Sequence, residues 1–221
     1  MIKLFQYGFF PFAVSWARAK RLTHMKGLIA FFFGVAAVFP ALCGAMNFGP
    51  DIYISARDQK MAVFEHGEVL AKYRISTSKF GLGDSQGSYK TPLGTLWVCN
   101  KIGANLPLGA VIRHRNATGE VLSPNAPGRD PIVTRVIWLS GLEPQNRNAY
   151  ARCIYIHGTP EERSLGKPAS YGCIRMRSKD VADLYKLVQV GTHITISDKG
   201  LSSLMPSEHR NGIAGNASTT D

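Results

Sequence analysis

The sequence predicts one mainly β domain, closed as a sandwich or a barrel. Three observations favour this class: short β-favouring runs recur along most of the chain, only one segment has clear helical periodicity, and the connecting loops are long and contain glycine and proline. The 221 residues, with 45% hydrophobic content, are enough to form one ordinary core. A single domain is therefore expected.

The first half of the domain is predicted to be a series of short strands. β-favouring residues occur at 52–54, 61–64, 69–75 and 96–98. The polar residues 57–59 separate the first two runs, which is typical of a hairpin. The stretch 79–95 is rich in glycine and serine and leads into the fourth strand.

A long, poorly periodic stretch follows at 100–131 and contains four prolines. Loops of this length in compact domains usually bind a ligand or cover a site, so we expect a binding loop or lid. Two more strands are expected over 132–139 and 151–156. The polar loop 140–148 separates them.

One amphipathic helix is expected, with Ser178 as its cap and Asp180 in its first turn. Its apolar face consists of Val181, Leu184, Tyr185 and Val188. Gly191 ends the helix, and residues 193–197 alternate as a last strand. Residues 200–221 are expected to form a disordered tail.

Residues 1–46 have the layout of an export segment. A basic group at 18–26 precedes the almost wholly apolar run 27–46, which ends in small residues. Cleavage near Ala45 is favoured, while retention as a membrane anchor and lipidation at Cys43 stay open. In each case we expect the domain, residues 47–199, to lie outside the cytoplasmic membrane.

The net charge of +11 is partly a property of the N-terminal segment. Five of the 26 basic side chains precede the domain, which leaves 21 basic against 15 acidic side chains, or about +6. No basic helix or aromatic-basic stretch stands out, so no nucleic-acid partner is expected. The three histidines at 66, 114 and 193 lack metal-ligand spacing, so no metal site is expected either.

The four cysteines leave a spare thiol. Loss of Cys43 with an export segment leaves Cys99, Cys153 and Cys173, an odd number in an oxidising compartment. A disulfide between Cys99 and Cys153, with Cys173 free, is one arrangement. Unpaired, buried thiols at 99 and 153 are the other, and both stay open.

The segment 157–175 carries the candidate chemistry. His157 is expected at a strand end, because Gly158 and Pro160 follow, and to share a strand face with Tyr155 and Cys153. Sixteen residues later comes the run Ser170, Tyr171, Gly172, Cys173. A glycine before a cysteine lets a carbonyl group approach the sulfur, and successive amides of a tight turn can point at one oxygen. A thiolate, an imidazole and such amides are the parts of an acyl-transfer site.

This pattern resembles the signature of the L,D-transpeptidase family, also called the YkuD-domain family. The matching positions are His157, Gly158, Gly166, Pro168, Ser170, Gly172, Cys173, Arg175 and Met176. The likeness extends over about 51–197, through Gln59, Ser76, Thr77, Thr91, Pro92, Gly94 and 180–196. The resemblance implies a YkuD-like, mostly β sandwich or barrel with one flanking helix and long loops.

The resemblance also implies roles for individual residues. Cys173 forms a thioester with a peptidoglycan stem peptide, and His157 is the base, oriented by the carbonyl of Gly158. The oxyanion and site-shaping set comprises Tyr171, Gly172, Gly158 and Ser170, together with the amide of Cys173. Tyr155 and Arg175 are the substrate-binding candidates, and for Arg175 a structural ion pair stays equally open.

Tyr171 stands where the family usually has histidine. Its main-chain N–H is retained and its ring can line the pocket, so activity is expected to survive. The implied reaction releases D-alanine from a tetrapeptide stem and passes the acyl group to an amine, without a cofactor. Trimming or cross-link hydrolysis on the same site, and a catalytically silent wall-binding module, stay open. The implied location is the periplasm or cell wall.

Overall fold

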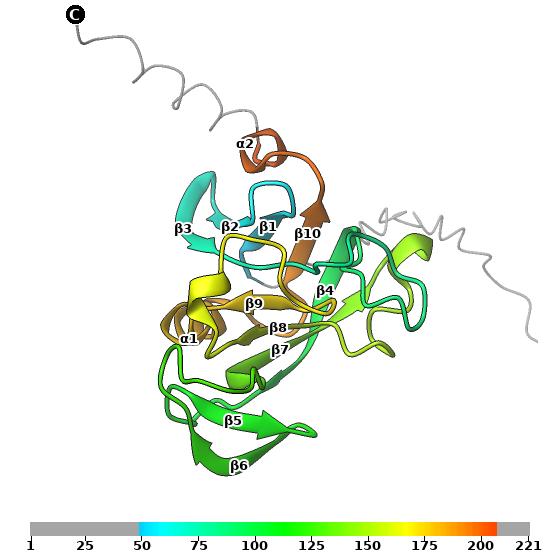
Figure 1. Cartoon of the computed structure of the whole chain (residues 1–221). Helices are drawn as coiled ribbons and strands as arrows, with labels where there is room; N and C mark the ends of the chain where they lie inside the picture. The colour runs from blue at the N-terminus through cyan, green and yellow to red at the C-terminus, as the bar shows by residue number, and fades with distance from the viewer. Residues whose placement is uncertain (1–48, 207–221) are drawn as a thin grey trace, which may run out of the picture. The chain divides into compact units, whose positions relative to one another are not determined.

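The computed structural model describes residues 49–206 of the chain, and strands dominate this part (Figure 1). The strands are β1 (Asp51–Ser55), β2 (Lys60–Glu65), β3 (Glu68–Arg74), β4 (Gly94–Ile102), β5 (Ala110–Arg113), β6 (Asn116–Val121), β7 (Val133–Gly141), β8 (Tyr155–Gly158), β9 (Ile174–Met176) and β10 (His193–Ser197). The helices are α1 (Ser178–Leu187) and α2 (Leu201–Leu204), with short 3-10 turns at Pro144–Asn146 and Glu162–Ser164.

The strands of the described part belong to one ten-stranded sheet in the order β3-β2-β1-β10-β4-β7-β5-β6, with β8 beside β7 and β9 beside β8. The pairs β1 with β10 and β8 with β9 are parallel. Ser76, just after β3, exchanges two backbone hydrogen bonds of 3.0 and 2.9 Å with Arg175 of β9. This bridge connects the β3 end of the path to the β8–β9 branch, so the strands from β3 through β7 to β9 close into a ring, as in a barrel.

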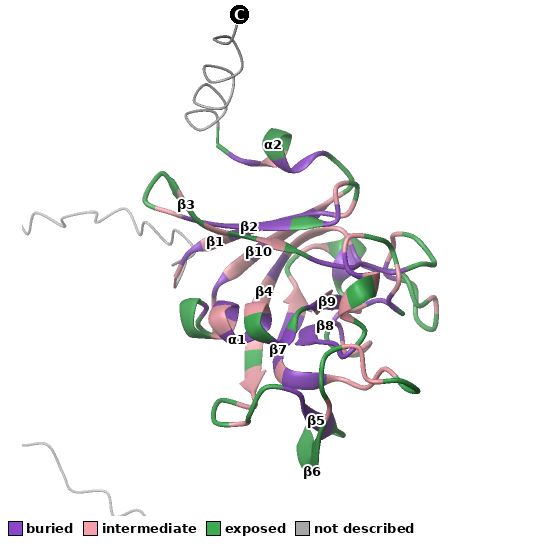
Figure 2. Cartoon of the chain, turned by 60° about the vertical axis from the view of Figure 1, so that its left-hand side comes forward, coloured by how far each residue is buried: buried purple, intermediate pink, exposed green. Residues whose placement is uncertain are grey.

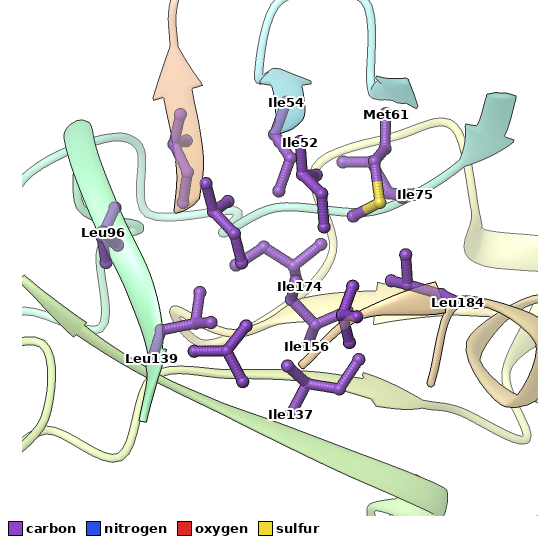
Figure 3. Close-up of a cluster of buried hydrophobic side chains, with 14 of the residues drawn as sticks. Ile52, Ile54, Met61, Ile75, Leu96, Ile137, Leu139, Ile156, Ile174 and Leu184 are labelled. Atoms are coloured by element: carbon purple, nitrogen blue, oxygen red, sulfur yellow. The ribbon is translucent and has the colours of Figure 1, made fainter. Parts of the chain in front are cut away.

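A buried apolar core fills this ring (Figure 3). Its largest fully buried side chains include Ile52, Ile54, Met61, Ile75, Leu96, Ile137, Leu139, Ile156, Ile174 and Leu184. Helix α1 contributes Val181 and Leu184 from its apolar face. Because strand side chains alternate, the residues next to Ile156 and Ile174 point to the opposite face of the sheet.

The mainly β class and most of the individual elements are confirmed. The predicted hairpin is β1 with β2, the third strand is β3, and the strand at 96–98 is the centre of the longer β4. The strand expected at 132–139 is β7, and β10 has the predicted bounds. The amphipathic helix is α1, but it ends at Leu187, so the prediction that it includes Val188 and is ended by Gly191 is wrong because Val188 has an extended backbone.

The prediction of an irregular loop over 100–131 is wrong for residues 110–121, which form the hairpin β5–β6. His114 and Arg115 join its strands with positive φ angles of 48° and 68°, the backbone conformation that suits a two-residue hairpin turn. Every residue of β6 is exposed (Figure 2). The strand therefore has no buried face, and its sequence shows no hydrophobic alternation.

The strand predicted over 151–156 begins only at Tyr155. Before it, the N–H of Arg152 donates to the Asn148 carbonyl and the N–H of Cys153 to the Tyr150 carbonyl, at 2.9 and 3.0 Å. Cys153 has a positive φ of 56°. Cys153 therefore lies in a turn, and the prediction that it shares a strand face with His157 is wrong.

Ser178 is the first residue of α1 rather than its cap. Its N–H donates to the Glu162 carboxylate at 3.0 Å, and its hydroxyl accepts from Thr134 at 2.8 Å. Glu162, which is distant in sequence, thus supplies the acceptor that a cap would provide.

The ends of the chain differ in how far the structure describes them. Beyond Lys199, Leu201 and Met205 are buried against Ala62, so residues 200–206 of the predicted tail are packed. Residues 207–221 and the predicted export segment, 1–46, lie outside the described residues. Within 49–206, no helix has the length and apolar character needed to cross a bilayer.

Candidate active site

Two adjacent parallel strands bring His157 and Cys173 to one face of the sheet. His157 of β8 pairs with Arg175 of β9, and Cys173 immediately precedes β9. Residues two apart on a strand point the same way, so Cys173 and Arg175 share the face opposite the Ile174 side chain. Cys173 is therefore a diagonal neighbour of His157, a relationship in which side chains of adjacent strands interact.

The imidazole of His157 is buried, with 6% of the residue exposed. Its Nδ1 lies 2.8 Å from the carbonyl oxygen of Gly158. A carbonyl oxygen accepts only, so Nδ1 carries the proton and Nε2 of the neutral ring is left as the acceptor. Burial lowers the pKa of His157 to about 4, the Gly158 hydrogen bond opposes this, and the Arg175 cation adds to it. The ring is therefore neutral near pH 7.

The Cys173 thiol is half-buried, and its sulfur donates to the carbonyl oxygen of Cys153 at 3.4 Å. Burial raises the pKa of Cys173 to about 11, against the hydrogen bond that the N–H of Tyr155 gives to the sulfur. Among the hydrogen bonds of residues 49–206, none joins the sulfur to the imidazole. The resting site thus holds a protonated thiol and a neutral base on the same face.

Gly172 gives the chain its turn before Cys173. Its φ is +120°, a backbone conformation that disfavours any side chain. A Cβ there would also lie only 3.3 Å from the Lys90 carbonyl oxygen, which is a tight contact. The buried Thr91 hydroxyl donates to the Gly172 carbonyl at 2.9 Å. The Gly172 N–H donates to the Ser170 hydroxyl at 3.2 Å. One of the three amides expected to hold an oxyanion is therefore already engaged.

Ser170 ties the turn together and links it to the rest of the sheet. Its hydroxyl donates to the Cys173 carbonyl oxygen at 2.5 Å, and its N–H donates to the Thr77 carbonyl at 3.0 Å. Thr77 is fixed in turn by the buried Gln59 side chain, whose amide makes contacts of 2.7 and 2.8 Å with the Thr77 hydroxyl and N–H. A chain of hydrogen bonds thus runs from Gln59 to the nucleophile's turn.

Arg175 forms an ion pair with Asp130, with 2.5 Å between Nη2 and Oδ2. The two side chains are only 11% and 19% exposed. Asp130 also accepts a hydrogen bond from the Thr159 hydroxyl. The ion-pair alternative for Arg175 is thus present in the structure, directly beside His157.

Tyr155 is buried against Trp138, with its ring edge-on at a centroid distance of 5.4 Å. Burial and a hydrogen bond with Cys153 raise the pKa of its phenol, and a hydrogen bond with Arg115 opposes them. Beside it lies a cavity of about 210 Å³, lined by Ile112, His114, Arg115, Ile132, Val136, Cys153 and Tyr155. Cys173 packs against the same apolar cluster but is not among the residues that line this cavity.

A larger cavity, of about 430 Å³, lies against the first turn of α1. It is lined by residues 108–109 and 121–124, at the two ends of the β5–β6 hairpin, and by Glu162 and 177–180, and it contains none of the predicted site residues. The thiol and imidazole, not the size of the cavity, therefore define the candidate site.

Tyr171 points away from the core and is exposed. Lys79 donates from Nζ to its hydroxyl oxygen at 2.9 Å, and this cation lowers the pKa of the phenol. Its ring contacts those of Phe80 and Tyr89. Tyr171 thus belongs to an aromatic surface beside the turn that leads to Cys173.

Sequence reasoning missed the residues that hold the nucleophile's surroundings in place. Arg152 and Asp84 form an ion pair of 2.7 Å with side chains 5% and 4% exposed. Arg152 also donates to the Lys90 carbonyl at 2.6 Å, which fixes the loop 79–91 against the turn before β8. No local pattern signals this pair, because its members are 68 positions apart. For Thr91, the only signal in the sequence was its position in the resemblance to the L,D-transpeptidase family.

The described part of the chain also contains three cysteines and several possible metal ligands. Cys99, Cys153 and Cys173 are all unpaired, as in the second of the two arrangements left open, although Cys99 and Cys153 are only half-buried. In the described part of the chain, no cluster of three or more His, Cys, Asp or Glu residues has the geometry to hold a metal ion.

Comparison with known proteins identifies the family to which this chain belongs. A family model described as the YkuD L,D-transpeptidase catalytic domain matches residues 49–196. A Bacillus subtilis protein named "Putative L,D-transpeptidase YqjB" is 29% identical over 175 residues, 79% of this chain and 86% of that protein. The B. subtilis protein named "Putative L,D-transpeptidase YkuD" is 37% identical over 90 residues, 37% of this chain and 50% of that protein.

Solved structures with a similar backbone include an L,D-transpeptidase from Mycobacterium smegmatis. It has a TM-score of 0.43 and 20% identity, and the match covers 67% of this chain and 58% of that chain. The chain therefore spans little more than half the length of this solved relative and half the length of YkuD.

Proposed function

Since the chain belongs to the YkuD family of L,D-transpeptidase catalytic domains, we propose that it is a cysteine-dependent acyltransferase acting on peptidoglycan stem peptides. The observation that carries the proposal is the pairing of β8 with β9. It supports the proposal because Cys173, just before β9, is adjacent to the strand that carries His157, whose Nδ1 lies 2.8 Å from the Gly158 carbonyl oxygen. A nucleophile and an oriented base are the minimum that such chemistry needs.

The first step forms a thioester. Nε2 of His157 removes the thiol proton, and the sulfur attacks the carbonyl carbon at the L-centre of diaminopimelate in the stem. The carbonyl electrons move to oxygen, where the main-chain amides of Tyr171 and Cys173 stabilise the charge, since the Gly172 N–H is engaged with Ser170. Collapse of this intermediate breaks the bond to D-alanine, whose amine leaves with the proton from His157.

The second step regenerates the enzyme. An amine of a neighbouring stem attacks the thioester, His157 takes a proton from that amine, and the departing sulfur takes the proton back. The N–H of Tyr155 favours the transient thiolate in both steps, because it points at the sulfur. Peptidoglycan lies outside the cytoplasmic membrane, so the proposal includes export of the domain.

Purified protein incubated with disaccharide-tetrapeptide muropeptides tests the proposal. Cross-linked dimers identified by mass indicate transpeptidation, loss of D-alanine alone indicates carboxypeptidase trimming, and cleavage of added dimers indicates endopeptidase activity. Unchanged muropeptides with the unmodified protein would contradict enzyme function and favour a silent wall-binding module.

A matched pair of cysteine variants assigns the nucleophile. Cys173→Ala should abolish product formation, whereas Cys99→Ala, which removes another half-buried thiol, should retain it. Equal activity in the two variants removes Cys173 from the mechanism.

A further inference from the structure

Three aromatic side chains form an exposed cluster next to the nucleophile's turn. Phe80 and Tyr89 come from the loop 79–91, and Tyr171 is two residues before Cys173. The ring centroids are 5.4 Å apart for Phe80 and Tyr171, 5.8 Å for Phe80 and Tyr89, and 6.0 Å for Tyr89 and Tyr171. Each ring thus contacts the other two, and we call these three residues the aromatic platform.

The aromatic platform remains open to solvent although its members pack together. Phe80, Tyr89 and Tyr171 are 44%, 57% and 55% exposed. Their planes are inclined to one another by 42°, 54° and 88°, so the rings do not cover each other face to face. Contiguous exposed apolar surface of this kind usually marks a binding site.

The aromatic platform is held rigidly against the candidate active site. The Tyr89 carbonyl accepts from the buried Ser78 hydroxyl at 2.5 Å. Thr91, two residues further on, binds the Gly172 carbonyl, and Arg152 holds the Lys90 carbonyl. A molecule that extends out of the site over Gly172 therefore meets these rings.

The polar groups around the rings indicate the chemistry of the occupant. Lys79 lies 4.3 Å from the centroid of the Tyr171 ring and 5.3 Å from that of Phe80, so a cation sits against the aromatic surface. Lys90 is exposed at the other end of the same loop, while the acidic Asp84 is buried by Arg152. The surface is thus aromatic and cationic. Its cations can attract the carboxylates that stem peptides bear.

We propose that the aromatic platform binds the N-acetylated sugar to which a donor stem peptide is attached, so that the enzyme prefers glycan-linked stems to free peptides. A pyranose ring has an apolar C–H face that packs on an aromatic ring, and its hydroxyl and acetamido oxygens accept from Lys79 and the tyrosine hydroxyls. The inference rests on the proposed function, because a stem peptide bound in the active site brings its attached sugar to the aromatic platform.

Two donors that differ only in the sugar test the inference. One is the free tetrapeptide and the other is the same tetrapeptide on its disaccharide, each with the same amine acceptor. For the unmodified protein we expect kcat/KM to be about 10-fold higher with the disaccharide-linked donor, the effect of one modest stacking contact. Equal values for the two donors overturn the inference.

Variants of the two loop residues identify the surface responsible. In the double variant Phe80→Ala/Tyr89→Ala, KM for the sugar-linked donor should rise until the preference is about 2-fold or less, with kcat for the free peptide unchanged. Tyr89→Trp keeps a ring and should keep the preference. Leu70→Ala on β3, which removes a side chain of similar exposure, is the matched control. A preference that survives in the double variant overturns the inference.

A binding measurement separates this inference from the proposed function. Cys173→Ala protein is titrated with the peptide-free disaccharide of the donor, and the ring resonances of Phe80 and Tyr89 are followed by NMR. Saturable shifts at about millimolar ligand support the aromatic platform. Their absence overturns it, whereas absence of turnover with either donor contradicts the proposed function and leaves this titration to decide the sugar site.

Discussion

The Cys173 thiol donates its hydrogen bond to the Cys153 carbonyl oxygen, 3.4 Å away. In this resting arrangement the proton is held away from His157, although the two side chains share a sheet face. The proposed mechanism therefore requires the sulfur to rotate toward the imidazole before proton transfer. Catalytic hydrogen bonds that form only in the substrate complex are common.

The pH dependence of acylation should reflect this neutral pair. Burial lowers the pKa of His157 to about 4 and raises that of Cys173 to about 11, so the thiol is protonated and the base is free between these values. The rate of Cys173 acylation by a carbapenem, followed by intact mass, should be level from about pH 5 to pH 9. An acid limb near the ordinary histidine pKa of about 6.5 contradicts this.

His157→Gln should separate the base from its structural contact. The glutamine amide can still donate to the Gly158 carbonyl but cannot accept a proton near pH 7. We expect the acylation rate to fall by about 10² to 10⁴, as for loss of a general base, with a folded protein by circular dichroism. A rate within a few-fold of the unmodified protein assigns the base elsewhere.

Thr91→Val should reveal how strongly the turn depends on one buried hydroxyl. The substitution keeps the shape but leaves the Gly172 carbonyl and the Ser78 N–H without their partner. We expect a loss of about 1 to 3 kcal/mol in the free energy of unfolding and slower acylation. Urea denaturation measures the first, and Thr195→Val on β10 serves as the control. Equal effects of the two substitutions contradict a special role for Thr91.

Arg152→Met should be among the most damaging single changes outside the candidate site. It leaves the Asp84 carboxylate buried without its cation and frees the Lys90 carbonyl. The expected loss is about 3 to 5 kcal/mol in the free energy of unfolding. Lys186→Ala, which removes the exposed pair with Asp183, should cost about 1 kcal/mol or less. The comparison fails if both variants unfold at the same urea concentration.

Arg175→Gln and Asp130→Asn together decide the role of Arg175. The ion pair predicts that each variant loses about 1 to 3 kcal/mol of stability and that donor KM changes little in either. Carboxylate recognition predicts instead that only Arg175→Gln raises KM. We expect the first result, because Asp130 already occupies the guanidinium. Unfolding curves and steady-state kinetics on the same preparations distinguish the two.

The sequence alone determined the local elements that have a clear period or a characteristic run. Runs of β-favouring residues identified β1 and β2, alternation identified β10, and the helical period identified α1. The run Ser170–Tyr171–Gly172–Cys173 and the distant His157 indicated the candidate chemistry because these residue types supply a nucleophile, a tight turn and a base.

Tertiary structure decided everything that depends on contacts between distant residues. The β5–β6 hairpin left no pattern because β6 has no buried face. Glu162, not Ser178, provides the capping acceptor of α1. Burial set the protonation states of His157 and Cys173. The contacts of Arg175 with Asp130 and of the Cys173 thiol with the Cys153 carbonyl could not be predicted from the sequence. Residue type and spacing fix local geometry, whereas desolvation and long-range pairing exist only once the sheet has closed.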